Sequence, residues 1–339
     1  MEPKQVQSLL IQYVIDMRDK MKLAPNSMKV RLASIKTFFQ LNDFDGINWF
    51  KVKKYTGEFY RIAEDRPYKR GEIKKMFDAA HSLRDKAIIL LLSSSGIRRG
   101  GVIKLQLKHL KKIDKHDIYA IDVYKKAKEQ YYTFCTPETR KTIEDYLNWR
   151  TKLGEKLTPE SPLFRREFDT RFGARANVAP MSEGALKDIL KRLREETGLV
   201  ENQPITESVK LGAYRSEIMT CHGFRKYFAT TIKGNGMDKT YSEIVMGHDI
   251  GLDKVYFKPT MEEVLEGNDR MRGYVSVIND LTINEENRLR KQVAEQDHTI
   301  QHKLAEKDKQ IEEMKHKQEK FEGIIQSLID SSQLKPLNQ

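Results

Sequence analysis

Apolar residues recur at mostly helical spacing along residues 1–63 of this chain. The clearest segment predicts a helix capped by Asn26 or Ser27, because its apolar positions fall three or four residues apart. Those positions are Met28, Leu32, Ile35, Phe38 and Phe39. Residues 64–70 are charged and contain Pro67, which predicts an exposed linker after a helical N-terminal domain.

Residues 71–272 mix helical and strand-like patterns. An apolar run within Asp85–Ser95 predicts a buried helix. β-Branched and aromatic residues at Ile118–Val123 and Tyr131–Phe134 predict two strands, and the lysine-rich residues 124–130 between them predict a hairpin tip. Further helical patterns cover residues 140–152, 182–196 and 225–233. We therefore expect a mainly α protein with a small antiparallel β-sheet, of the α+β class.

Residues 283–332 contain no proline and predict one long helix with a heptad repeat. Eight of eleven positions in alternating steps of four and three residues are apolar, as in a coiled coil. The eleven positions are Val293, Asp297, Ile300, Leu304, Lys307, Ile311, Met314, Gln318, Phe321, Ile325 and Leu328. This pattern predicts self-association through a C-terminal coiled-coil tail.

The charge balance points to a polyanionic partner. Lys and Arg number 61 against 49 Asp and Glu, which gives a net charge of +12. Residues 1–70 carry +6 and residues 283–339 carry −1, which leaves +7 for the residues between them. Nucleic acid or an anionic membrane surface is the first partner to consider. The positive charge lies in front of the tail, so we do not expect the tail to be the main DNA binder.

Other classes of protein are less compatible with the sequence. No run of about 18 apolar residues occurs, so we expect no membrane-spanning helix. Cys135 and Cys221 are too few for a disulfide framework and are wrongly spaced for a cysteine-based zinc site. Neither a P-loop nor a carboxylate cluster occurs, so we expect no nucleotide or metal cofactor. We expect a soluble protein of the cytoplasm.

Four short patterns carry residue types that can act on a phosphodiester. They are Ser95–Gly100, the hairpin lysines, His222–Thr230, and Met246-Gly247-His248 with Tyr256 eight residues after the histidine. Taken singly, each pattern is more typical of an ordinary surface or structural feature. Their order along the chain (Arg, Lys, His-x-x-Arg, Gly-His, Tyr) is the more specific signal.

In this order the patterns resemble the tyrosine recombinase family of the phage-integrase type. His222–Thr230 is similar to the family's His-x-Leu-Arg-His-x-Phe-Ala-Thr signature, and Met246–His248 to its Leu-Gly-His. Ser95–Arg98 is similar to its Thr-Gly-Leu-Arg, although Gly101 stands where the family usually has Glu. The resemblance covers about residues 5–272.

The resemblance implies a domain order and an origin. It implies a DNA core-binding domain over residues 1–63, a linker at 64–70 and a catalytic domain over 71–272, before the tail at 283–332. Residues 131–138 are most similar to integrases of archaeal viruses and mobile elements. The protein would then act at the nucleoid, or in the host cytoplasm if a virus encodes it.

The resemblance also implies a catalytic set. Two arginines would clamp the phosphate, since guanidinium offers fixed bidentate donors, and a tyrosine would be the nucleophile. Lysine would be the general acid, and the two histidines would donate hydrogen bonds or handle protons. The set is Arg98, Lys125, His222, Arg225, His248 and Tyr256. Lys126 and Lys128 remain alternatives for the lysine, and Tyr274 for the nucleophile.

The function implied is site-specific DNA recombination through a 3′-phosphotyrosyl intermediate, which integrates or excises a mobile element. The expected partners are double-stranded DNA attachment sites, further copies of the chain in a tetramer, and an accessory directionality factor. Two alternatives stay open. One is a type IB topoisomerase-like nicking enzyme, which would use the same site without synapsis. The other is a non-catalytic architectural DNA-binding protein, which would not need Tyr256.

Overall fold

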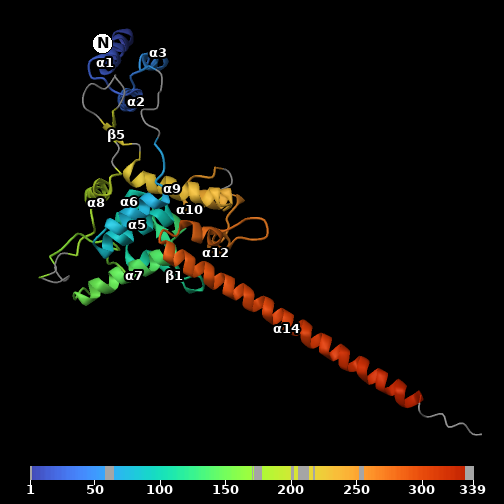
Figure 1. The fold of residues 1–339 in the computed structure, drawn as a ribbon. Helices are drawn as coiled ribbons and strands as arrows, with labels where there is room; N and C mark the ends of the chain where they lie inside the picture. The colour runs from blue at the N-terminus through green and yellow to red at the C-terminus, as the bar shows by residue number, and fades with distance from the viewer. Residues whose placement is uncertain are drawn as a thin grey trace, which may run out of the picture.

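A computed structural model describes the chain over residues 2–57, 65–169, 171, 178–199, 202–204, 214–216, 218–251 and 256–332. Figure 1 shows a small N-terminal group of helices, a larger mixed unit and a long C-terminal helix. The larger unit is mainly helical and contains a small antiparallel sheet, so the predicted fold class is confirmed. Within the described ranges, every helix is too short or too polar to cross a lipid bilayer.

The N-terminal unit comprises α1 (Pro3–Asp19), α2 (Pro25–Leu41) and α3 (Trp49–Lys54). These helices share a core of their own, formed by Val6, Leu10, Val14, Met17, Met28, Leu32, Ile47 and Val52. The predicted cap of α2 at Asn26 or Ser27 is wrong. The helix already begins at Pro25, because proline has a helical φ and needs no hydrogen bond in the first turn.

The chain after the N-terminal unit is not an exposed linker over its whole length. Glu64 lies outside the described residues, but Tyr68 is only 1% exposed and its ring lies 4.5 Å from that of Phe224. Arg66 forms a 2.8 Å ion pair with Glu72 at the start of the next helix. The charged residues on both sides of Tyr68 led to the prediction of an exposed linker. The buried ring of Tyr68 instead holds this segment against the larger unit.

The helices of the larger unit surround α5 (Leu83–Ser95), which confirms the predicted buried helix. Side chains on every side of α5 are buried, and it packs against α7 (Pro137–Lys152) and α9 (Thr220–Gly234). The remaining helices are α4 (Arg70–Ala79), α6 (Arg99–Lys104), α8 (Glu183–Glu196), α10 (Lys239–Val245), α12 (Met261–Glu266) and α13 (Ile278–Leu281). Short 3₁₀ turns lie at Leu107–His109, Asp114–His116 and Tyr274–Val277.

The sheet has the antiparallel order β1-β2-β3. Its strands are β1 (Leu110–Ile113), β2 (Ile118–Val123) and β3 (Tyr131–Phe134), so both predicted strands and their hairpin are confirmed. Val123 pairs with Tyr131 across the hairpin. The sequence did not predict β1. A second, two-stranded sheet joins β4 (Asn202–Pro204) and β5 (Tyr214–Ser216).

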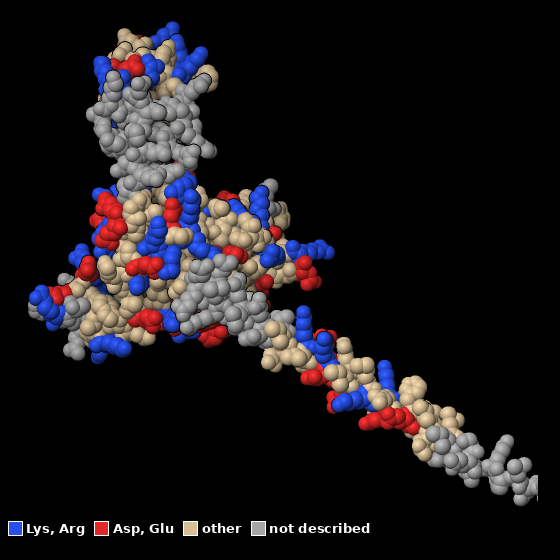
Figure 2. Space-filling model, in the orientation of Figure 1, with Lys and Arg blue, Asp and Glu red and all other residues tan. Residues whose placement is uncertain are grey.

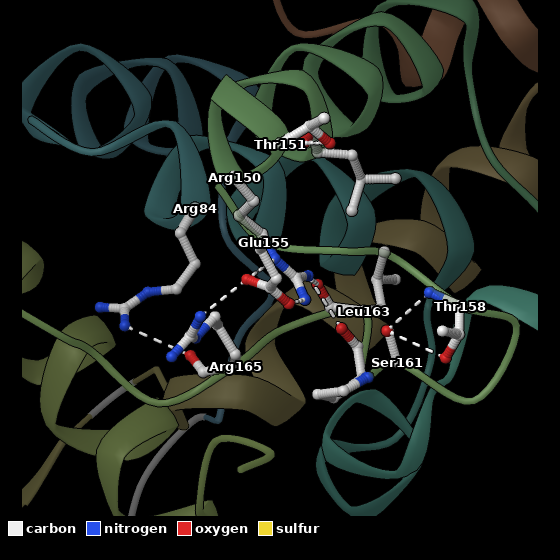
Figure 3. A network of polar contacts seen from close by, with 10 residues as sticks. Arg84, Arg150, Thr151, Glu155, Thr158, Ser161, Leu163 and Arg165 are labelled. Carbon is white, nitrogen blue, oxygen red and sulfur yellow. Dashed lines mark hydrogen bonds and ion pairs between the residues drawn. The ribbon is translucent and has the colours of Figure 1, made fainter. Parts of the chain in front are cut away.

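A buried ion network joins the end of α7 to the following loop. Figure 3 shows the carboxylate of Glu155 between the guanidinium groups of Arg150 and Arg165. All three side chains are almost fully buried, and Arg150 also donates to the carbonyl of Leu163 at 3.0 Å. Burial alone would raise the pKa of the Glu155 carboxyl, but hydrogen bonds from the two arginines outweigh it and lower that pKa.

The core of the larger unit continues past residue 272, the predicted end of the catalytic domain. Tyr274, Val277 and Ile283 are buried in it. The backbone N–H groups of Ile283 and Asn284 donate to the carboxylate of Glu138, at 2.5 and 3.1 Å. The chain then enters α14 (Glu285–Ser332), which extends away from the unit (Figure 1).

Candidate active site

A tight turn after α5 sets the position of Arg98. Gly96 ends α5 with a φ of 58°, and a Cβ there would lie 2.3 Å from the ring of Phe228. Only glycine fits both the left-handed backbone and this close approach. The turn places Arg98 directly before α6, where its Nη2 donates to the carbonyl of Gly247 at 3.1 Å.

Arg225 projects from the middle of α9 and is 6% exposed. Its Nη1 donates to the carbonyl of Gly96 at 2.7 Å, and its Nη2 donates to the carbonyl of Met246. The side chain therefore joins the turn after α5 to the turn after α10. Burial, with a smaller contribution from the positive charge of Arg98, lowers the pKa of the Arg225 guanidinium below its usual value. Arginine nevertheless stays protonated in proteins.

The turn at Gly247 brings the Gly-His pattern against the sheet. Gly247 has a φ of 62°, and a Cβ there would lie 2.4 Å from the ring of Tyr131. The guanidinium carbon of Arg98 lies 5.8 Å from the centre of the same ring, within cation–π range. Tyr131 thus supports both the Arg98 side chain and the turn that leads to His248.

His248 is held at both ring nitrogens. Its Nε2 lies 2.8 Å from Nη2 of Arg225, and its Nδ1 contacts the carboxylate of Glu243. Arginine has no acceptor, so Nε2 accepts this hydrogen bond and Nδ1 carries the proton that is donated to Glu243. Lys233 contacts the other oxygen of Glu243. Burial alone would raise the pKa of the Glu243 carboxyl, but the hydrogen bonds from Lys233 and His248 lower it.

The hairpin lysines differ in their surroundings. Lys125, the preferred candidate, lies 3.3 Å from the carboxylate of Asp122, which is itself 3.5 Å from Lys111. Lys128 instead lines a cleft of about 940 Å³. Lys126 has a positive φ of 68° at the tip of the hairpin. The structure thus brings Lys128, more than Lys125, into the cleft that Arg98 lines.

The cleft lies between the β2–β3 hairpin and the turn after α10. Its described lining combines cationic side chains with three carboxylates and apolar surface. The basic and imidazole residues are Arg98, Lys104, Lys128, His248 and Lys258, and the acids are Asp122, Glu129 and Asp249. The four cationic side chains outnumber the three carboxylates, which suits the open cleft to an anionic substrate, and His248 also lines it.

His222 lies one turn before Arg225 on α9, at an exposed position. Partial desolvation, followed by the nearby positive charge of Lys226, lowers the pKa of its imidazole. His222 is not among the residues that line the cleft. Of the predicted set, the structure therefore joins Arg98, Arg225 and His248, and leaves His222 and Lys125 outside that cluster.

The two candidate tyrosines have opposite environments. Tyr256 is 86% exposed, and its neighbour Phe257 lines the cleft and lies 6.3 Å from Tyr241, ring to ring. Tyr274 is fully buried, and its hydroxyl donates to the carbonyl of Ser94 at 2.7 Å. Burial raises the pKa of Tyr274 well above its usual value. Tyr274 is therefore wrong as an alternative nucleophile, since DNA cannot reach it.

Gly101, which stands where the family usually has Glu, has a steric explanation. Gly101 is buried, and a Cβ there would lie 3.0 Å from Val123 and 3.1 Å from Ile97. A longer side chain would require the side chains of Val123 and Ile97 to shift. Arg98 is oriented instead by the carbonyl of Gly247 and the ring of Tyr131.

Sequence reasoning missed three residues of the site: Glu243, Tyr131 and Lys104. Glu243 lies five residues before His248, a spacing that a helical pattern does not bring together. The two meet only because the chain turns back at Gly247. Tyr131 carried a signal, since it begins a predicted strand directly after the lysine-rich tip.

The chain is similar to a known protein family and to several known proteins. A family model described as "Phage integrase family" matches residues 69–262. Transposase A from transposon Tn554 of Staphylococcus aureus is 22% identical over 265 residues, which cover 69% of this chain and 66% of that protein, a little under two thirds of its length. Tyrosine recombinase XerC of Leptospira interrogans is 20% identical over 275 residues, covering 78% and 76%.

Among solved structures, the Tn1549 transposon integrase in complex with transposon right end DNA matches with a TM-score of 0.52. The identity is 14%, and the match covers 76% of this chain and 82% of that one, so it shows a shared fold. The family match spans more than half of the chain. The chain belongs to the phage integrase family of tyrosine recombinases.

Proposed function

We propose that this chain is a site-specific DNA recombinase that cleaves and rejoins DNA through a covalent phosphotyrosine. One observation carries the proposal: Arg98 and His248 line an open cleft with three lysines, and the buried Arg225 behind them donates to His248 and to the carbonyl of Gly96, while Arg98 donates to the carbonyl of Gly247. A non-catalytic DNA-binding surface needs exposed basic residues, but it does not need a buried arginine locked to a histidine.

The cluster would stabilise the pentavalent transition state. Negative charge builds on the non-bridging oxygens of a phosphodiester as it is attacked, and fixed cationic donors lower the energy of that charge. Arg98 and Arg225 would supply the clamp. His248 would add a donor or accept a proton once phosphate displaces its bond to Arg225.

Tyr256 would be the nucleophile. Its hydroxyl oxygen attacks phosphorus, the bond from phosphorus to the 5′ oxygen breaks, and a 3′-phosphotyrosyl bond forms. The tyrosine proton leaves to a base of the cluster, and the 5′ oxygen takes a proton from a general acid. Attack by a 5′ hydroxyl reverses every step, so no nucleotide cofactor is consumed. The exposure of Tyr256 beside a cleft-lining residue supports this role.

Two further roles complete the proposal. A hairpin lysine would be the general acid, with Lys125 the family-like choice and Lys128 the one nearer the cleft. His222 would contact the phosphate from the first turn of α9, so its lowered pKa would rise when DNA binds.

DNA would be held between the two units. The residues 1–63 would form the core-binding domain, whose α3 ends in Lys51, Lys53 and Lys54. Affinity would come mostly from phosphate contacts and fall steeply with salt. Two attachment sites would be joined by four protomers, and a directionality factor would choose integration or excision. An origin in an archaeal virus and action at the nucleoid are further parts of this proposal.

The experiment that tests this function uses a supercoiled plasmid carrying two copies of a site selected from a random duplex library by binding to the protein. Recombination gives two smaller circles or an inverted segment. Relaxation without rearrangement would instead indicate the topoisomerase-like activity. Binding with neither product would favour an architectural protein.

A further inference from the structure

The helix α14 presents a row of exposed apolar side chains that no other described element covers. Six of them are between 46% and 66% exposed: Ile300, Leu304, Ile311, Met314, Phe321 and Ile325. They occupy positions in the alternating steps of a heptad, over about 38 Å from residue 300 to residue 325 at 1.5 Å per residue. Figure 2 shows basic, acidic and uncharged residues interspersed along this helix.

From this face we propose that α14 pairs with α14 of a second copy of this chain, as a parallel two-stranded coiled coil. The proposal is independent of the catalytic one, because it requires no residue of the active site. We propose a second copy as the partner because of the charges beside the seam, which is the row of heptad positions where the two helices would meet. Basic residues beside this seam in one helix would face acidic residues in an identical helix.

The charges that flank the seam select the parallel direction. In a parallel pair, the residue before an a position faces the residue after the next d position of the other helix. Lys303 of one copy then faces Asp308 of the other, and Lys317 faces Glu322. Each contact occurs twice in a symmetric pair, which gives four attractions and no repulsion at these positions.

An antiparallel pair on the same seam is less favoured. In this arrangement Ile311 of one helix lies beside Met314 of the other, and Leu304 lies beside Phe321. The attractive charge pair beside the seam is then Asp308 of one helix with Lys315 of the other. The parallel pair instead stacks Gln318 on itself, and a polar residue at an a position is a known device for fixing register. Lys307 would extend its ammonium out of the seam along its aliphatic stem.

The base of α14 is fixed to the larger unit. The Glu138 carboxylate accepts the N–H groups of Ile283 and Asn284 directly before the helix, and Ile283 is buried. A parallel pair would therefore place the two larger units at the same end of the coiled coil, whereas an antiparallel pair would separate them by the length of the helix. The pairing would bring two copies onto neighbouring DNA half-sites.

Charge reversal in the full-length protein tests the partner. We expect Lys303→Glu with Lys317→Glu, and separately Asp308→Lys with Glu322→Lys, to raise the dimer dissociation constant about tenfold or more. An equimolar mixture of the two variants should restore dimers, measured by sedimentation over a range of concentrations. Lys309→Glu with Lys320→Glu, the same charge change off the seam, is the control and should leave the dimer unchanged. A wild-type protein that is monomeric at every concentration would overturn the proposal, as would variants that dimerise like the wild type.

Disulfide formation tests the direction. Gln318→Cys should give a cross-linked dimer under mild oxidation, because residue 318 meets itself only in the parallel arrangement. His316→Cys, on the outer face of the helix, should not cross-link. Dimers that form without a Gln318→Cys cross-link would overturn the parallel arrangement. Circular dichroism of each variant confirms that α14 stays helical.

Discussion

Nη2 of Arg225 lies 2.8 Å from Nε2 of His248, while the opposite nitrogen of the same ring contacts Glu243. The histidine is thus fixed in one tautomer by a carboxylate that does not line the cleft. Glu243 is a positioning residue, since it acts on the substrate only through His248.

Replacing Glu243 with Gln should slow DNA cleavage about tenfold, since the imidazole loses the carboxylate that orients it. Single-turnover cleavage of a nicked duplex measures this effect. Lys233→Gln, which reaches the site only through Glu243, should have a smaller effect. A wild-type rate for Glu243→Gln between about pH 6 and pH 9 would remove the positioning role.

Arg98→Lys should lower the cleavage rate by roughly 10²–10³-fold, because lysine keeps the charge but loses the planar pair of donors. The adjacent Arg99 provides a matched control. It forms a 2.8 Å ion pair with Glu183 and does not line the cleft. Arg99→Lys should cleave at nearly the wild-type rate. Equal effects of the two substitutions would contradict the assignment of Arg98 to the phosphate clamp.

Gly247→Ala should destabilise the protein by roughly 3 kcal/mol for two reasons. Alanine is strained at this left-handed φ, and its Cβ would clash with the ring of Tyr131. Gly198 has a similar φ of 69°, but a Cβ there would meet no atom within 4 Å. Gly198→Ala should therefore cost only about 1 kcal/mol. Urea unfolding of both variants gives the comparison, and equal losses would show that the Tyr131 contact does not constrain the turn.

Glu155→Gln should lower the free energy of unfolding by about 3–5 kcal/mol at pH 7, because it leaves Arg150 and Arg165 buried without their carboxylate. The folded pKa of Glu155 is lowered, so its contribution is fully present above the usual value of 4.5 and is lost as the pH falls through the folded pKa. The difference between wild type and variant should therefore shrink in urea titrations below about pH 4.5.

Exposed Glu160, 4.0 Å from Lys108, is the control for that comparison. Its replacement by Gln should change the free energy of unfolding by less than about 1 kcal/mol at either pH. A Glu155→Gln protein as stable as this control would show that the buried network in Figure 3 contributes little to folding.

The sequence predicted those elements whose signal is local. The apolar run of α5 and the β-branched strands β2 and β3 each contain their own pattern, so their positions were predicted correctly. Strand β1 was missed because Lys111 and Lys112 fill half of it. It is a strand only because it pairs with β2, which is a non-local interaction.

The candidate site also divides into residues with a local sequence signal and residues placed by non-local contacts. The order of motifs along the chain identified Arg98, Arg225 and His248, which the structure brings together. It did not identify Glu243, whose role depends on the turn at Gly247. It preferred Tyr256 but left Tyr274 as an alternative, because the burial of Tyr274 arises from packing of the chain after residue 272 against α5.

The identity of the nucleophile is the central claim, and peptide mapping of the DNA-linked protein tests it most directly. The protein is trapped on a nicked duplex that carries its site, digested with protease and nuclease, and sequenced by mass spectrometry. We expect a nucleotide adduct on Tyr256, absent from Tyr256→Phe and retained in Tyr274→Phe. An adduct on any other residue, or none on a substrate that the protein binds tightly, would contradict it.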